Sequence, residues 1–136
     1  MKLPYILATA IMTLAINAMA HDHLANPNAK VFIISPKDGA TVSSPVTVKF
    51  GLEGMKVSPA GTGPANSGHH HLIVDGALPA LDKPMGGEVK HFGKGQTETS
   101  LELSPGQHTL QLIMGDKTHT PHKKPIYSEQ ITITVK

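Results

Sequence analysis

The chain has 136 residues, which is enough for one domain with a hydrophobic core and too few to expect two. It contains no cysteine, so disulfide bonds, thiolate ligands and a cysteine-linked lipid anchor are excluded. Twelve lysines and no arginine oppose ten acidic residues, and the formal charge of +2 lacks the concentrated basic face that nucleic-acid binding requires. We therefore expect no nucleic-acid partner.

Residues 1–20 are typical of a secretory signal peptide. Lys2 supplies a basic start, residues 5–16 are apolar, and residues 18–20 (AMA) match a cleavage site. The apolar run is shorter than about 18 residues, which disfavours the alternative of an uncleaved membrane anchor. Cleavage after Ala20 predicts a secreted, periplasmic protein without stable membrane insertion.

The rest of the chain alternates short β-branched runs with proline- and glycine-rich turns, a pattern that predicts an all-β protein. Residues 21–29 have no periodicity and are expected to form a flexible arm before a single domain at 30–136. The expected strands lie at 30–35, 46–50, 68–75, 88–92, 97–103, 108–114 and 131–135. About seven short strands without an amphipathic helix favour an immunoglobulin-like antiparallel β-sandwich, with a small barrel as the alternative.

Nine histidines are the unusual feature of the composition, and three of them are consecutive at 69–71. In an immunoglobulin-like sandwich, the segments that carry eight of them gather at one pole. Only His108 is expected at the opposite pole, where Asp75 can form a hydrogen-bonded pair with it.

Strand alternation divides the histidine triplet between two faces. Leu72 belongs to the core, so His70 should also point inward, either as a ligand or as a neutral imidazole hydrogen-bonded to a backbone carbonyl or to Asp116. His69 and His71 share the other face, about 6 to 7 Å apart along the strand, which suits two ligands of one ion.

The loop at 115–125 contains a second candidate half-site, the pair His119 and His122. The 68–75 strand should pair antiparallel with the strand that ends at Met114, which brings the two half-sites together. The expected metal ligands are His69, His71, His119 and His122. Further candidate ligands are His70, His91, Asp116, His21 and His23.

An imidazole-rich site without thiolate suits Cu(II), with Zn(II) or another divalent transition metal as the alternative. Met55 is a candidate thioether ligand for Cu(I). Cleavage after Ala20 would place His21 at the amino terminus and His23 in the third position. The terminal amine, backbone amides and imidazoles of such a terminus can chelate Cu(II) or Ni(II), in a square-planar site or a histidine brace.

Four motifs resemble an exported bacterial family, the domain of unknown function 4399. They are residues 68–75 (GHHHLIVD), 91–98 (HFGKGQTE), 103–112 (LSPGQHTLQL) and 119–122 (HTPH). The resemblance extends from Lys30 to the end of the chain and implies an exported protein, without an activity or a ligand. A weaker similarity to CopC-like periplasmic copper carriers rests on His21 and on residues 35–40 (SPKDGA).

The leading hypothesis is a periplasmic, histidine-rich module that captures copper or exchanges it with a metal donor or acceptor protein. Its affinity should fall as the pH drops through the histidine pKa near 6.5. The alternatives are a structural or interaction domain of the cell envelope, a hydrogen-bonded polar cluster and a protonation sensor.

Catalysis is not expected, because the chain lacks a tryptophan platform, a catalytic triad and paired carboxylates. Oxidase or oxygenase chemistry at a histidine brace is the remaining enzymatic alternative. The oligomeric state stays open.

Overall fold

A computed structural model describes residues 25–136, so the expected signal peptide, His21 and His23 lie outside the described residues. Within 25–136 there are nine strands and no helix. The strands are β1 (Lys30–Ser35), β2 (Thr41–Val42), β3 (Val46–Glu53), β4 (Lys56–Val57), β5 (Ser67–Val74), β6 (Lys90–His91), β7 (Glu98–Leu101), β8 (Gly106–Gly115) and β9 (Ile131–Val135). No helix in this part of the chain is long and apolar enough to cross a membrane.

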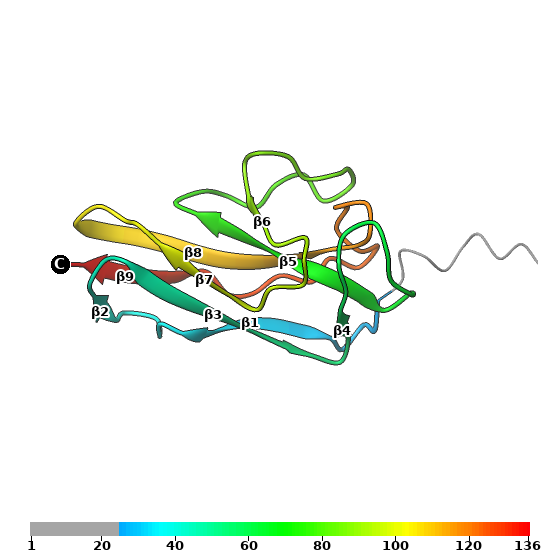
Figure 1. Ribbon diagram of the computed structural model, residues 1–136, viewed down its shortest axis with the longest axis horizontal. Coiled ribbons are helices and arrows are strands. Elements are labelled where there is room, and N and C mark those ends of the chain that lie inside the picture. The colour runs from blue at the N-terminus through cyan, green and yellow to red at the C-terminus, as the bar shows by residue number, and fades with distance from the viewer. Residues whose placement is uncertain (1–24) are drawn as a thin grey trace, which may run out of the picture.

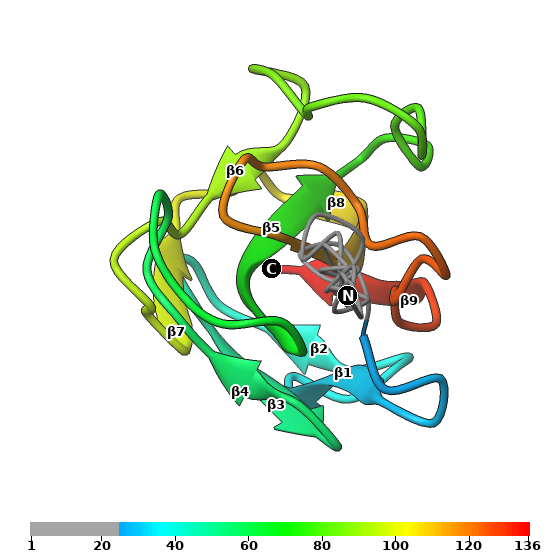
Figure 2. The same ribbon diagram turned by 90° about the vertical axis from the view of Figure 1, so that its right-hand side faces the viewer.

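The strands form a sandwich of two sheets (Figure 1). One sheet has the order β1-β3-β7, and the other has the order β2-β9-β8-β5-β4, with β6 paired to β5. In Figure 2, which looks along the sandwich, β5, β8 and β9 lie above β1 and β3. The strand order confirms the expected immunoglobulin-like all-β sandwich.

The six strands of four or more residues among those described coincide with runs that show alternation in the sequence. The two-residue strands β2 and β4 were not predicted from the sequence, because two residues are too few to show a period of two. Both pair parallel to a longer strand, β2 to β9 and β4 to β5. The stretch between the expected strands at 46–50 and 68–75 is therefore partly strand, since β3 continues to Glu53 and β4 follows at Lys56–Val57.

The main core lies between the two sheets and contains the alternating inward residues of the long strands. From β3 it receives Val46, Val48 and Phe50, and from β8 it receives Leu110, Leu112 and Met114. Leu72 of β5 is fully buried with them. These residues confirm the face that alternation assigned to the core.

A second, smaller apolar cluster lies on the outer face of β5 and β8. It joins Ile73 and Ile113 to Met85 and Val89, which belong to the segment between β5 and β6. Figure 1 shows this segment, drawn in green to yellow, above the outer face of the larger sheet. The second cluster therefore anchors the segment between β5 and β6 over the part of β5 that carries His69 and His71.

The register of β5 sets the neighbours of its histidines. The strand pairs antiparallel with β8, so that His69 is opposite Gly115 and His71 is opposite Ile113. This confirms the expected pairing of the 68–75 strand with the strand that ends at Met114. On its other edge, β5 pairs with β6, and His71 is opposite His91.

Candidate metal centre

The triplet at the start of β5 divides between the two faces as alternation predicts. His70 points into the main core, with its ring centroid 5.1 Å from that of Phe50. His69 and His71 lie together on the outer face, with ring centroids 4.6 Å apart. The expected hydrogen bond of His70 is wrong, because neither of its ring nitrogens has a partner in its apolar surroundings.

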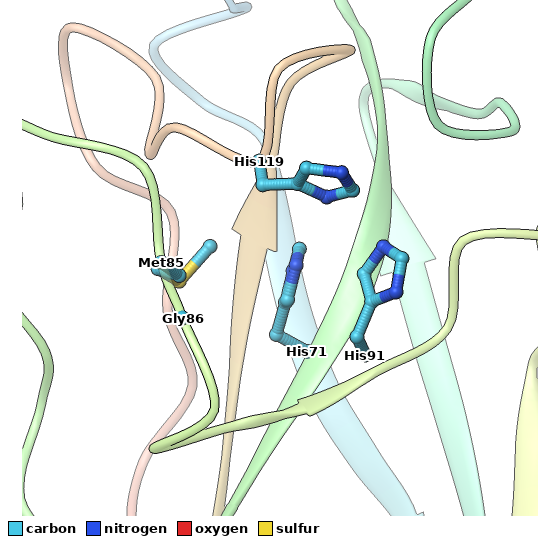
Figure 3. A pocket seen from close by; sticks show the side chains of 5 residues that line it. All are labelled: His71, Met85, Gly86, His91 and His119. Carbon is cyan, nitrogen blue, oxygen red and sulfur yellow. The ribbon is translucent and has the colours of Figure 1, made fainter.

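Four histidines converge on the outer face of β5, and we call them the histidine quartet. Its members are His69, His71, His91 and His119. Each offers one ring nitrogen, and these four atoms all lie within 4.8 Å of one another. Figure 3 shows the rings of His71, His91 and His119 facing the same space. They come from three segments that are far apart in the sequence.

His91 reaches the quartet through strand pairing. It is the residue of β6 directly opposite His71, and opposite residues of paired strands project from the same face. A glycine makes room for its ring, because a Cβ at Gly93 would lie 2.7 Å from His91 Nε2. Any larger residue at position 93 would therefore displace the imidazole.

His119 is presented by a tight loop that follows β8. Its backbone adopts a left-handed conformation with φ of 64°, and its N–H donates to the backbone oxygen of Asp116 at 2.9 Å. The Asp116 carboxylate is buried inside this loop and accepts hydrogen bonds from the N–H groups of Thr118 at 2.8 Å and Thr120 at 3.1 Å. Asp116, expected as a further candidate ligand, thus shapes the loop that holds His119.

His69 Nε2 lies between two other ring nitrogens. It is 3.0 Å from His119 Nδ1 and 3.1 Å from His91 Nε2. A ring nitrogen has either one N–H or one lone pair in the ring plane, so His69 Nε2 can form one good hydrogen bond and not two. A cation among the three atoms would instead accept a lone pair from each of them.

The two deepest members of the quartet have buried ring nitrogens that lack a hydrogen-bond partner. His69 is 0% exposed and His71 is 1% exposed. Neither ring nitrogen of His71 has a partner, and His69 Nδ1 has none. Buried polar atoms normally form hydrogen bonds, so a set of unpartnered nitrogens beside other imidazoles points to a ligand.

Electrostatics keeps these rings neutral. Burial, reinforced by the neighbouring histidines, lowers the pKa of His71 to about 3 and that of His69 to about 4. Burial and His119 also lower the pKa of His91. At neutral pH the three rings therefore have lone pairs available for a metal ion, which requires neutral imidazole.

The spacing of the quartet fits one transition-metal ion. With metal–nitrogen bonds of about 2.0 to 2.1 Å, ligating nitrogens lie about 3.3 Å apart in a tetrahedron and at most about 4.1 Å apart across the ion. The 3.0 and 3.1 Å separations are suited to neighbouring ligands. The 4.8 Å limit on the remaining separations requires closure by at most about 0.7 Å for nitrogens across the ion, or at most about 1.5 Å for a tetrahedron.

His122, which the sequence predicted as a ligand, lies outside the quartet. It is 1% exposed, and its Nε2 donates to the backbone oxygen of Ser67 at 3.0 Å. Its Cε1 lies 3.0 Å from the position of a Cβ on Gly68, which alternation places on the inner face with His70. The chain between His119 and His122 therefore passes from one side of β5 to the other.

Two contributors to the site were missed in the sequence, Gly115 and Met85. A Cβ at Gly115 would lie 2.6 Å from Cε1 of His71 and 3.1 Å from Cε of Met85, so this glycine makes room for both side chains. The pairing of the 68–75 strand with the strand ending at Met114 was the available signal for Gly115. Met55, the thioether candidate in the sequence, packs instead against the main core.

Residues 25–136 form an all-β sandwich domain, and its histidine quartet could hold a metal ion. The chain belongs to the family described as Domain of unknown function (DUF4399), whose model matches residues 48–136. This match confirms the resemblance seen in the four motifs and includes the whole quartet. No curated protein and no solved structure matches this chain. The similarity to CopC-like copper carriers stays a prediction.

Proposed function

We propose that this protein is a periplasmic metal-binding module that captures a divalent transition metal, copper in the first place, or exchanges it with a donor or acceptor protein. The observation that carries the proposal is the position of His69 Nε2, about 3 Å from two other ring nitrogens that it cannot satisfy together by hydrogen bonds. The unpartnered nitrogens of His71 support the same conclusion.

The ligand chemistry favours copper over the other candidates. Imidazole suits copper, zinc, nickel and iron, whereas the absence of carboxylate in the quartet disfavours hard cations such as Mg²⁺ and Ca²⁺. Among divalent first-row metals, Cu²⁺ binds such sites most tightly. Zn(II) is the alternative, because four imidazoles also provide a tetrahedral set.

Burial differs within the quartet in a way that suits exchange. His69 and His71 are buried on β5, which is paired on both edges, whereas His91 is exposed and His119 is half-buried. An incoming ligand approaches from the exposed side and replaces His91 or His119 first. Capture and transfer therefore need no opening of the sandwich.

Calorimetric titration of the metal-free protein with Cu(II) and with Zn(II) tests the proposal. We expect one ion per chain, and a loss of about 100-fold or more in affinity for the His71→Ala/His119→Ala variant. This exceeds the 10- to 100-fold typical of groups that merely support a ligand. His108→Gln, a change of a histidine at the other pole, is the matched control and should bind as the wild type does.

Copper chelation by the amino terminus must be separated from binding at the quartet. The same titrations are therefore repeated with His21→Ala/His23→Ala, which removes the terminal imidazoles and leaves the quartet intact. Binding that disappears in this variant and persists in His71→Ala/His119→Ala would contradict the proposal. Absence of binding to the wild type would contradict it as well.

A structural or interaction domain of the cell envelope is the second candidate function. It is favoured by large apolar side chains on the surface, Phe32 at 39%, Ile34 at 43% and Tyr127 at 47% exposure. Recovery of a stoichiometric partner with metal-free protein tests it, with Phe32→Ser/Ile34→Ser expected to abolish the association. A partner that binds equally well to this variant would contradict the second candidate.

A further inference from the structure

A pocket of about 210 Å³ adjoins the histidine quartet. It is lined by His71, His91 and His119 together with Met85 and Gly86 (Figure 3). His69 is fully buried and does not line this pocket. An ion held by the quartet would therefore have His69 behind it and its open side facing the pocket.

Met85 forms part of the wall on that open side. Its side chain is 8% exposed and belongs to the small apolar cluster with Ile73 and Ile113. Its backbone N–H donates to the backbone oxygen of His119 at 2.9 Å, which sets its position relative to a quartet member. Figure 3 shows the end of the Met85 side chain directed toward the space between His71 and His119.

The space above Gly115 shows how closely Met85 borders the quartet. The position of a Cβ on Gly115 lies 3.1 Å from Nδ1 of His71 and 3.1 Å from Cε of Met85. The two side chains therefore share the volume that the glycine leaves open. Methionine has three rotatable side-chain bonds, so the Met85 sulfur can be reoriented within this volume.

A thioether adds a soft, uncharged donor to four imidazoles. Soft sulfur ligands select Cu(I), whereas imidazole serves Cu(II) and Zn(II). We propose that Met85 is a fifth ligand on the pocket side of the quartet, an inference that rests on the proposed function. The site would then retain copper as both Cu(I) and Cu(II). Met85 then determines which oxidation state the site holds more tightly.

Affinity measurements on Met85→Leu test this inference, because leucine keeps the apolar contacts and removes the sulfur. Cu(I) affinity is measured without oxygen by competition with a colorimetric Cu(I) chelator, and Zn(II) affinity is measured by calorimetry. We expect a loss of about tenfold or more for Cu(I) and a change within about threefold for Zn(II). If the Cu(II) affinity is unchanged, a tenfold loss lowers the Cu(II)/Cu(I) potential by about 59 mV.

Met55→Leu is the matched control, since Met55 packs against the main core away from the quartet. X-ray absorption of the Cu(I)-loaded protein should show a sulfur neighbour in the wild type and in Met55→Leu, and none in Met85→Leu. Unchanged Cu(I) affinity in Met85→Leu, or equal losses for Cu(I) and Zn(II), overturns the role of Met85 while the quartet still binds metal. A wild type that binds neither Zn(II) nor Cu(II) overturns the proposed function and this inference together.

Discussion

The two ends of the β5–β8 pair place histidines in opposite environments. At one end, the ring nitrogens of His71 are buried and have no hydrogen-bond partner. At the other end, His108 Nδ1 donates to the Asp75 carboxylate at 2.6 Å and Nε2 donates to the backbone oxygen of Ser104 at 2.7 Å. Carboxylate and carbonyl oxygens only accept, so both bonds form together only when the His108 ring is protonated.

The pKa values follow from this contrast. The hydrogen bond to Asp75 and that to Ser104 raise the pKa of His108, whereas burial lowers the pKa of His71 to about 3. One end of the molecule therefore supplies partners that keep a proton on the ring. At the other end, the His71 ring nitrogens have no hydrogen-bond partners, so their lone pairs remain available to a metal ion. Histidine content alone would not have distinguished the two ends.

The largest expected effect is the stabilisation by Zn(II), which should depend on the histidines at one end of the β5–β8 pair and not on His108 at the other. An excess of Zn(II) about 1,000 times the dissociation constant should stabilise the wild type by about 4 kcal/mol. For a domain of this size, that raises the melting temperature by about 10 °C or more. Thermal unfolding with Zn(II) and with a chelator should show this full rise in His108→Gln and a much smaller rise in His71→Ala. An equal rise in both variants would contradict the contrast between the ends.

The second prediction concerns the glycine beneath the His71 ring. Gly115→Ala places a Cβ 2.6 Å from Cε1 of His71, so the ring must move and the quartet spacing changes. We expect metal affinity to fall about 10- to 100-fold, as for other residues that orient a ligand. Gly87→Ala is the control, because a Cβ there meets no atom within 4 Å. Calorimetry that shows equal affinities for the two variants would refute the prediction.

His70 provides an internal comparison, because it is adjacent to the quartet in sequence and faces the opposite side of the sheet. Both of its ring nitrogens are buried without partners, and an apolar side chain of similar volume removes this cost. We expect His70→Leu to raise the free energy of unfolding by about 1 kcal/mol and to leave metal affinity unchanged. Urea unfolding and calorimetry check the two parts. A loss of affinity as large as that of His71→Ala would make His70 a ligand.

The smallest expected effect is the pH dependence of the His108 pair. Because the folded pKa of His108 is raised above 6.5, its contribution to stability is complete below pH 6.5 and is lost as the pH rises through the folded pKa. Burial pushes the pKa of Asp75 up, but hydrogen bonds from His108 and Thr109 outweigh it, so the folded pKa lies below 3.8. The Asp75 contribution is therefore present above pH 3.8 and is lost as the pH falls through the folded pKa.

Unfolding of the metal-free wild type and of His108→Gln at pH 5.5 and 8.5 measures this dependence. The difference between the two proteins isolates His108, since the quartet is common to both. We expect the wild type to exceed the variant by more at pH 5.5 than at pH 8.5. A difference that grows toward pH 8.5 would mean that His108 is neutral in the folded protein.

Much of the fold was predictable because its causes are local. Alternation of β-branched and polar residues located the long strands and assigned His69 and His71 to one face and His70 to the other. Pairing of the 68–75 strand with the strand ending at Met114 also followed, as did the contact between Asp75 and His108. Each depends on the period of a strand or on chain order in a sandwich.

The composition of the candidate site depended on contacts between distant segments. The sequence itself assigned His69 and His71 to one face of the 68–75 strand and predicted that the loop carrying His119 would lie near them. Tertiary structure decided that His91, one of several further candidates, would complete the set, through the pairing of β6 with β5. It also placed His122 on the other side of β5 and Met85 beside the pocket. The partner of a short strand and the path of a loop are set by what they pack against, so neither can be inferred from local pattern.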